Sequence, residues 1–351
     1  MMNHLQMKKK HMIIILISIG LAITLTTSFL LLQNNVFSEI ENMKKLSTNN
    51  ERITIGMSGE SENLLIMVAD TYGFFSEEGL DVSLKEYPSG KRALNEGLFA
   101  GEVDFATPAD VPIVFSSFER NDFSVVTNIG HSYDVSKIVA RSDKGISNPS
   151  DLEGKKIGTQ KESSVHFFLN LFLLKHNIPE KNIQILYKQP EELPGALADG
   201  QIDAFSMREP FVSQARDLLG DKIIIFEEPG LYQKTYSLVA FNKFVEENPQ
   251  IIKNVIRALI KAEDFVKEHP EESIKLISKT TNISESEVAA NWSNFDFVVS
   301  IDQAFLFSLD EHAAWAINEK FVNASAMPNY LDYIHTASLK EVKPGALKIF
   351  G

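Results

Sequence analysis

The chain has 351 residues, of which 44% are hydrophobic and 23% are charged, a composition that is ordinary for globular proteins and sufficient for about two domains. Its formal net charge of -13 argues against a nucleic-acid partner, because an acidic surface repels phosphate backbones. It contains no cysteine, which excludes disulfides, thiolate metal sites, a cysteine nucleophile and a lipid-bearing cysteine.

A basic segment and then an apolar segment open the chain. Lys8, Lys9 and Lys10 precede residues 12–32, which carry no charge. A membrane-spanning helix needs about 20 apolar residues, whereas the apolar core of a secretory signal has about 7 to 15. We therefore expect a cytoplasmic segment over 1–11, a transmembrane anchor over 12–32, a polar tether over 33–51, and an extracytoplasmic remainder. Cleavage of this segment as a signal, which would give a secreted protein, is the alternative.

The remainder of the chain contains an internal repeat, in which three landmarks occur twice in the same order. The pairs are "ITIGMSGES" (53–61) with "KKIGTQKESS" (155–164), "LDVSLKEYP" (80–88) with "IQILYKQP" (183–190), and "AGEVDFATPAD" (100–110) with "DGQIDAFSMRE" (199–209). Segments of helical periodicity lie between these strand-like landmarks. The pattern predicts two similar α/β lobes, each with a largely parallel sheet, whose strand ends face one cleft. Asp104 and Asp203, which precede equivalent strands, are interpreted as capping or turn residues.

The last third of the chain predicts one strand, "YSLVAFN", followed by helices. Asn248 and Pro249 favour one helix start, the capping-box pattern of 284–287 favours another, and 303–321 predicts a third helix. We expect these helices to pack on the first lobe. Lobe 1 is then discontinuous, 52–133 plus 237–351, lobe 2 spans 134–236, and the two chain crossings between them form a hinge.

Five segments in a fixed order carry a family resemblance: "ADTYGFFSEEGLDVSL", "GEVDFATPAD", "DLEGKKIGT", "ALADGQIDAFSMREPF" and "VAFNKFVEENP". They resemble the nitrate/sulfonate/taurine and thiamine-pyrimidine group of ABC-transporter substrate-binding proteins, over about residues 52–330. The resemblance implies the type II periplasmic binding protein fold, a small solute as ligand, and an ABC permease with its ATPase subunit as partners. It implies neither a cofactor nor catalysis.

Carried over by position, the resemblance also implies the solute contacts, which follow the strands of both lobes: Ser58, Gly59, Glu60, Ser89, Gly90, Pro108, Ala109, Asp110, Thr159, Gln160, Ser163, Ser164, Arg208 and Glu209. Helix N-termini at such positions offer free N–H groups to an anion. Many relatives have Trp where this chain has Arg208, which favours an anion such as a sulfonate or carboxylate over a stacked ring. The alternative for Arg208 is a structural ion pair with Glu60, Asp110 or Glu209.

A few further residues are candidates without a family pattern. His131, close to the first chain crossing, is a candidate ligand contact, whereas His166 is interpreted as half-buried packing. Tyr232, Tyr236 and Trp292 are candidates to close over a ring, and interlobe packing is their alternative role. The eight histidines lack the spacing of a metal site, and no glycine-rich phosphate loop is present, so neither a metal nor a nucleotide is expected.

The sequence therefore predicts an extracytoplasmic solute-binding component of an ABC importer, which captures a small anion of the sulfonate, nitrate or taurine kind between two lobes. The alternatives are a binder of a thiamine-pyrimidine-like heterocycle, a cofactor-independent enzyme on the same fold, and a sensory receptor that reports to a membrane kinase.

Overall fold

The computed structural model describes residues 50–281 and 283–350. The predicted segments 1–11 and 12–32, and the tether up to residue 49, lie outside the described residues. Residues from Glu51 onward form one compact unit. Within the described ranges, no helix combines the length and the apolar character that crossing a membrane requires.

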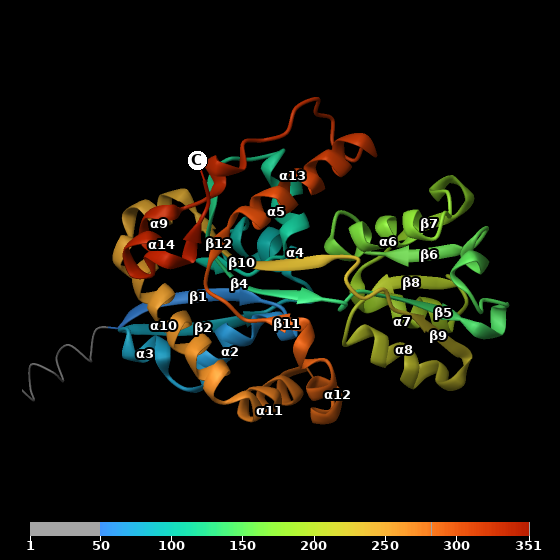
Figure 1. Ribbon diagram of the computed structural model, residues 1–351, viewed down its shortest axis with the longest axis horizontal. Helices are drawn as coiled ribbons and strands as arrows, with labels where there is room; N and C mark the ends of the chain where they lie inside the picture. Colours follow the sequence, from blue (N-terminus) through green and yellow to red (C-terminus); the bar gives the residue numbers. More distant parts are fainter. Residues whose placement is uncertain (1–49, 282, 351) are drawn as a thin grey trace, which may run out of the picture. The chain divides into compact units, whose positions relative to one another are not determined.

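Two separate sheets organise this unit, one in each half of Figure 1. We call the part built on the six-stranded sheet lobe 1 and the part built on the five-stranded sheet lobe 2. The lobe 1 sheet has the order β11 (Phe295–Asp296), β4 (Phe123–Tyr133), β10 (Gln233–Phe241), β3 (Phe105–Ala106), β1 (Glu51–Met57) and β2 (Leu80–Glu86). The lobe 2 sheet has the order β7 (Gln184–Tyr187), β6 (Lys156–Thr159), β8 (Ala204–Met207), β5 (Lys137–Arg141) and β9 (Ile223–Phe226). A two-stranded pair joins β12 (Ile301–Asp302) to β13 (Leu347–Lys348).

The internal repeat is visible in both sheets. Strand β1 lies between β2 and β3 in parallel, and β6 lies between β7 and β8 in the same arrangement. The Asp104 carboxylate accepts a hydrogen bond from Thr54 N at 2.7 Å, and Asp203 accepts one from Lys156 N at 2.9 Å. Each aspartate therefore binds the first strand of its own lobe, which confirms the capping interpretation of both residues.

The prediction of largely parallel sheets is wrong for the strands that follow the crossings. Strand β10 pairs with β3 antiparallel, and β5 pairs with β8 antiparallel. Each of these strands enters its lobe from the cleft, where the parallel strands end, so it must run in the opposite direction. The chain crosses between β4 and β5, and again between β9 and β10. The predicted lobe limits at 133/134 and 236/237 stay a prediction; the second falls inside β10.

Helices flank both sheets. Those of lobe 1 are α2 (Leu64–Thr71), α3 (Phe74–Glu77), α4 (Gly90–Arg92), the π-helix η2 (Ala93–Leu98), α5 (Asp110–Ser117), α9 (Asn242–Glu247), α10 (Pro249–Glu268), α11 (Pro270–Thr281), α12 (Glu285–Ala290), α13 (Gln303–Asn318) and α14 (Thr336–Val342). Those of lobe 2 are α6 (Ser164–Lys175), α7 (Leu193–Ala198) and α8 (Phe211–Leu219). Short 3-10 helices connect them: η1 (Ser61–Asn63), η3 (Ser142–Lys144), η4 (Pro149–Leu152), η5 (Glu180–Asn182), η6 (Pro190–Glu192), η7 (Gly220–Lys222), η8 (Trp292–Asn294), η9 (Tyr330–Tyr333) and η10 (Pro344–Ala346).

The predicted helix starts are confirmed. Helix α10 begins at Pro249, and the Ser284 hydroxyl accepts the N–H of Glu287 at 3.3 Å at the start of α12. Helix α13 ends at Asn318 rather than at 321, because the chain turns through Lys320 at a φ of 59°.

Helix α13 does not belong to lobe 1 alone, contrary to the prediction for the C-terminal helices. Its first half, with Phe305 and Leu309, packs in the core of lobe 1, whereas Trp315 and Ala316 pack in the core of lobe 2. Helix α5 divides in the same way, with Ile113 in the first core and Phe115 in the second. The two lobes therefore share apolar packing beside the hinge.

Candidate functional site

A small cavity lies where the ends of strands and helices of both lobes meet, and we call it the inner pocket. Its volume is about 20 Å³, close to the space that one water molecule needs. Its lining residues are Glu60, Ser89, Gly90, Lys91, Ala109, Pro112, Gln160, Ser163, Ser164, Val165, Arg208, Lys234 and Tyr236. These residues come from the turns after β1, β2, β3, β6 and β8 and from β10.

The first residues of two helices line the inner pocket. Helix α5 of lobe 1 follows the N-cap residue Ala109, and helix α6 of lobe 2 follows the N-cap residue Ser163. The first N–H groups of a helix lack partners within the helix and carry partial positive charge, so they favour an anion. Ser163 and Ser164 also line the pocket on the lobe 2 side, with their hydroxyls donated to Gln160 O at 2.5 Å and to Asp110 Oδ1 at 3.2 Å. The inner pocket therefore has the chemistry of an anion site.

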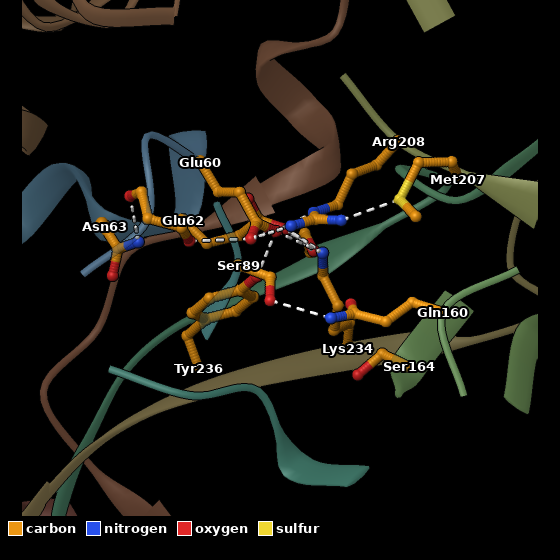
Figure 2. A network of polar contacts seen from close by, with 12 residues as sticks. Glu60, Glu62, Asn63, Ser89, Gln160, Ser164, Met207, Arg208, Lys234 and Tyr236 are labelled. Carbon is orange, nitrogen blue, oxygen red and sulfur yellow. Dashed lines mark hydrogen bonds and ion pairs between the residues drawn. The ribbon is translucent and has the colours of Figure 1, made fainter. Parts of the chain in front are cut away.

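An ion pair between the lobes forms one wall of the inner pocket. Figure 2 shows the Arg208 guanidinium, which follows β8, directed at the Glu60 carboxylate, which follows β1. Arg208 contacts both carboxylate oxygens, and both side chains are buried, with 6% and 5% of their surface exposed. Glu60 also accepts hydrogen bonds from Ser58 Oγ at 2.7 Å and from the Tyr236 hydroxyl. Of the three structural partners predicted for Arg208, the structure selects Glu60.

A second buried pair extends this network. Lys234 Nζ lies 2.7 Å from Glu62 Oε1 and 3.3 Å from Glu60 Oε2 (Figure 2). Glu62 also accepts a hydrogen bond from Ser132 Oγ at 2.8 Å. The two carboxylates and two cations compensate one another in charge. Burial raises the pKa of Glu60, but the charges of Arg208 and Lys234 outweigh it, so the pKa lies well below its ordinary value and Glu60 is ionised.

A larger cavity, the outer pocket, lies on the other side of the Glu60–Arg208 pair and has a volume of about 120 Å³. Both pockets are lined by Glu60 and Arg208, so this pair separates them. The other walls of the outer pocket come from residues 59, 61 and 62, from the first crossing at 134, 135 and 137, from Glu227, from Glu209, Val212 and Arg216 around α8, and from Thr281, Ile283, Glu287, Val288, Asn291, Asn294 and Phe295.

Polar contacts at the cleft hold the two lobes together. Gln160 Nε2 of lobe 2 donates to Ser89 Oγ of lobe 1 at 3.0 Å (Figure 2). At the rim, Lys91 pairs with Glu162 at 3.0 Å and Arg92 pairs with Glu191 at 2.9 Å. These contacts, together with the Glu60–Arg208 pair, describe a closed arrangement of the lobes, which explains the small volume of the inner pocket.

Asp110 is a structural junction and does not line either pocket. Its carboxylate, fully buried, accepts hydrogen bonds from the hydroxyls of Tyr232 and Ser164 and from Thr235 N at 3.1 Å, and it lies 3.4 Å from His312 Nε2. Burial raises the pKa of Asp110, but His312 and these donors outweigh it and lower the pKa. Asp110 thereby connects α5, α6, α13 and the second crossing.

The predicted contact residues divide into three groups. Those that line the inner pocket are Glu60, Ser89, Gly90, Ala109, Gln160, Ser163, Ser164 and Arg208. Gly59 and Glu209 line the outer pocket instead. Those that line neither of these two cavities are Ser58, Pro108, Asp110, His131, Thr159, Tyr232 and Trp292.

The residues of the third group have other surroundings. His131 Nδ1 lies 2.9 Å from Thr235 Oγ1 between paired strands, and Trp292 packs against Phe297 in the lobe 1 core, with 5.5 Å between ring centroids. Thr159 is buried at the end of β6. Tyr232 is held by Asp110, so neither Tyr232 nor Trp292 is placed to close over a ring in the inner pocket. His166 packs between Tyr187 and Trp315, which confirms the packing role, but it is fully buried rather than half-buried, and burial lowers its pKa to about 4.

Lys234 is the most consequential residue that the sequence interpretation missed. Tyr232, Lys234 and Tyr236 alternate along one segment, and a period of two places Lys234 and Tyr236 on the same face of β10. A lysine in "KTYSLVAF", an otherwise largely apolar strand, is a signal from which Lys234 could have been identified as a candidate site residue. Lys91 was also missed, although it lies next to the predicted Gly90.

Comparison with known proteins gives the family. Residues 61–273, more than half of the chain, match the family model described as NMT1/THI5 like. The chain belongs to this family. A Bacillus subtilis (strain 168) protein named as an aliphatic sulfonates-binding protein is 30% identical over 246 residues, which cover 68% of this chain and 72% of that protein.

Two other similarities concern the fold of the chain and the different functions for which its relatives are named. The crystal structure of the periplasmic aliphatic sulphonate binding protein from Escherichia coli superposes with a TM-score of 0.65 at 21% identity, over 81% of this chain and 97% of that chain. This match confirms the periplasmic binding protein fold. A Candida albicans (strain WO-1) protein named 4-amino-5-hydroxymethyl-2-methylpyrimidine phosphate synthase is 24% identical over 244 residues, 65% of this chain and 70% of that protein.

Proposed function

We propose that this protein is the extracytoplasmic solute-binding component of an ABC importer, and that its inner pocket captures the anionic group of a small organic solute, a sulfonate in the first instance. The observation that carries the proposal is the meeting of two helix N-termini, from α5 and α6, with the cations Lys91, Arg208 and Lys234 between the lobes. The relatives named for sulfonate binding support the solute class.

The closed pocket is too small for a sulfonate, so capture requires the lobes to open. The solute enters the open cleft, and its anionic group then gains contacts from both lobes as they close, which is how a ligand favours one of two conformations. The ion pairs Lys91–Glu162 and Arg92–Glu191 at the rim form in the same closing movement of the lobes. An ABC permease and its ATPase subunit are the proposed partners that receive the solute, and residues 12–32 are the proposed membrane anchor.

A thiamine-pyrimidine ring and enzymatic turnover are less well supported by the geometry. Among the residues that the structure describes, Tyr236 is the only aromatic one that lines the inner pocket, and its hydroxyl is bound to Glu60. The buried carboxylates Glu60 and Asp110 are both held by several partners, which leaves neither free to act as a base.

Isothermal titration of the full-length chain in a mild detergent tests the proposal, with methanesulfonate, butane-1-sulfonate, nitrate and a 4-amino-5-hydroxymethylpyrimidine as probes. We expect a sulfonate to bind, and Lys91→Met to weaken it about tenfold, because one charge-assisted contact is lost. The matched control is Lys243→Met, at a lysine whose side chain is 80% exposed on α9. Binding of the pyrimidine alone, or of no probe, would refute the proposal. Co-purification of permease and ATPase subunits with the full chain tests the partners.

A further inference from the structure

A third cavity lies beside the second chain crossing, and we call it the hinge pocket. Its volume is about 290 Å³, which is larger than either pocket of the cleft and close to the lower limit of small-molecule sites, about 300 Å³. Its walls come from α6 of lobe 2, from residues 231–235 and from α13 (Figure 1). It shares no lining residue with the inner or the outer pocket, so it is a separate site.

Apolar side chains form much of the wall of the hinge pocket. Phe307 of α13 is 64% exposed, and Leu171 of α6 and Leu231 are partly exposed. The buried rings of Phe167 and Tyr232 belong to the same wall and pack edge to face, with 5.3 Å between ring centroids. Hydrocarbon surface that enters the pocket is therefore removed from water.

One face of α13 brings an aromatic ring and a carboxylate into the hinge pocket. Ala304, Phe307, Ser308 and Glu311 all line it, and they follow one another at helical spacings of three and four residues. Each of the four keeps part of its surface exposed. Phe307 and Glu311 lie one turn apart, so one ligand can contact both side chains.

The Glu311 carboxylate has no cation beside it on its own helix. The residues three and four positions away are Phe307, Ser308, Ala314 and Trp315, none of which carries a charge. Among the described residues, no lysine or arginine lines the hinge pocket. The carboxylate is therefore available to a cation that enters the pocket.

The charged groups around the hinge pocket have partners elsewhere. Lys234 lies between two lining residues but faces Glu60 and Glu62 in the cleft, and Lys175, one turn beyond Leu171, pairs with Glu228. His312 lines the pocket and is 1% exposed, and its Nε2 lies 3.4 Å from the Asp110 carboxylate, which compensates any positive charge on the ring. The pocket thus presents a negative group to a ligand.

We propose that the hinge pocket binds an organic ammonium ion with a short aromatic or aliphatic body, whose charge pairs with Glu311 and contacts the ring of Phe307. A cation is attracted by the face of an aromatic ring as well as by a carboxylate. An anion would be repelled by both, and a neutral molecule of the same shape gains only the burial of its hydrocarbon surface. The inference concerns a site outside the cleft and does not depend on the proposed function.

The test compares 2-phenylethylamine with 2-phenylethanol by isothermal titration of the full-length chain in detergent at pH 7, with blank titrations into detergent subtracted. The two compounds have nearly equal size and differ by an ammonium in place of a hydroxyl. We expect the amine to bind about tenfold more tightly, because the alcohol forms neither the ion pair nor the cation–ring contact. Glu311→Gln should reduce this ratio about threefold. Asp310→Asn, at the neighbouring exposed acid that does not line the pocket, should leave the ratio unchanged.

Filling the cavity gives an independent readout. Ala304 is exposed and lines the hinge pocket, so Ala304→Trp should weaken both compounds at least tenfold while the thermal midpoint stays that of the wild type. The proposal is wrong if the alcohol binds as tightly as the amine, if Ala304→Trp binds the amine like the wild type, or if neither compound binds the wild type. None of these measurements uses a sulfonate, so a failure of the proposed function is a separate result.

Discussion

Replacing Arg208 by methionine should destabilise the fold by about 3 kcal/mol, because it leaves the buried Glu60 carboxylate without its main cation. Removing one partner of a buried ion pair costs about 3 to 5 kcal/mol. The lower end of this range applies here, because the Glu60 carboxylate retains its contacts with Ser58 Oγ at 2.7 Å, with Lys234 Nζ at 3.3 Å and with the Tyr236 hydroxyl. For a unit of about 300 residues the thermal midpoint should fall by about 5 °C.

Thermal and urea unfolding of the full-length chain in detergent measure this change. Adding Glu60→Gln to the variant should restore part of the lost stability, because the uncompensated charge is then removed and Glu62 still pairs with Lys234. Arg52→Met is the matched control, since the Arg52–Asp81 pair is 89% and 55% exposed, and it should change nothing measurable. Wild-type stability in Arg208→Met, or additive losses in the double variant, would refute the reasoning.

The same pair predicts a pH dependence with a defined sign. The folded-state pKa of Glu60 is lowered from its ordinary value of about 4.3, so the pair stabilises the fold above that pH. The contribution is lost as the pH falls towards the folded-state pKa. The stability difference between wild type and Arg208→Met should therefore shrink below about pH 4, and a difference that grows in acid would contradict the assignment.

Three further predictions concern the framework of the site. Asp104→Ala and Asp203→Ala, which remove equivalent carboxylate-to-backbone hydrogen bonds, should each cost about 1.5 to 3 kcal/mol in urea unfolding, and a loss confined to one of them would contradict their equivalence. Burial lowers the pKa of His166 to about 4, so wild-type stability should fall as the pH drops from 6.5 towards 4; His166→Phe should flatten that slope, and an unchanged slope would place the titration elsewhere. Tyr232→Phe removes one donor from Asp110 and should cost about 1 to 3 kcal/mol while methanesulfonate affinity, read by titration, changes little, because Tyr232 does not line the inner pocket.

The repeated framework of both lobes followed from the sequence because it depends on local patterns. The glycine, apolar residue and aspartate that precede β3 and β8 recur at equal spacing, and the hydrogen bonds of Asp104 and Asp203 show why both copies need the carboxylate. The helix start at Pro249 is equally local, since it requires only a proline at a first helical position.

The polar network between the lobes did not follow from the sequence, because partners in it are far apart along the chain. Arg208 and Glu60 are separated by 148 positions, and nothing near either residue distinguishes Glu60 from Asp110 or Glu209 as the partner. Lys234 was overlooked because a lysine in a strand is ordinarily exposed, whereas this one is 1% exposed and held by Glu60 and Glu62. Strand direction at the crossings also depends on the second lobe, so the antiparallel pairing of β5 and β10 was missed.

The repeat itself shows where the selectivity of the site arises, because equivalent positions in the two lobes have diverged. Asp110 and Glu209 are equivalent, and each accepts an N–H of its own helix, from Val111 at 2.8 Å and from Ser213 at 3.0 Å. The positions before them are Ala109 and Arg208. The alanine brings no charged side chain to the inner pocket, whereas the arginine brings a cation. Under the proposed function, an anion is therefore contacted by backbone N–H groups from lobe 1 and by a guanidinium from lobe 2. Restoring symmetry with Arg208→Ala would remove the guanidinium and leave Glu60 with Lys234 as its remaining cation, and so would weaken anion binding even in a protein that still folds.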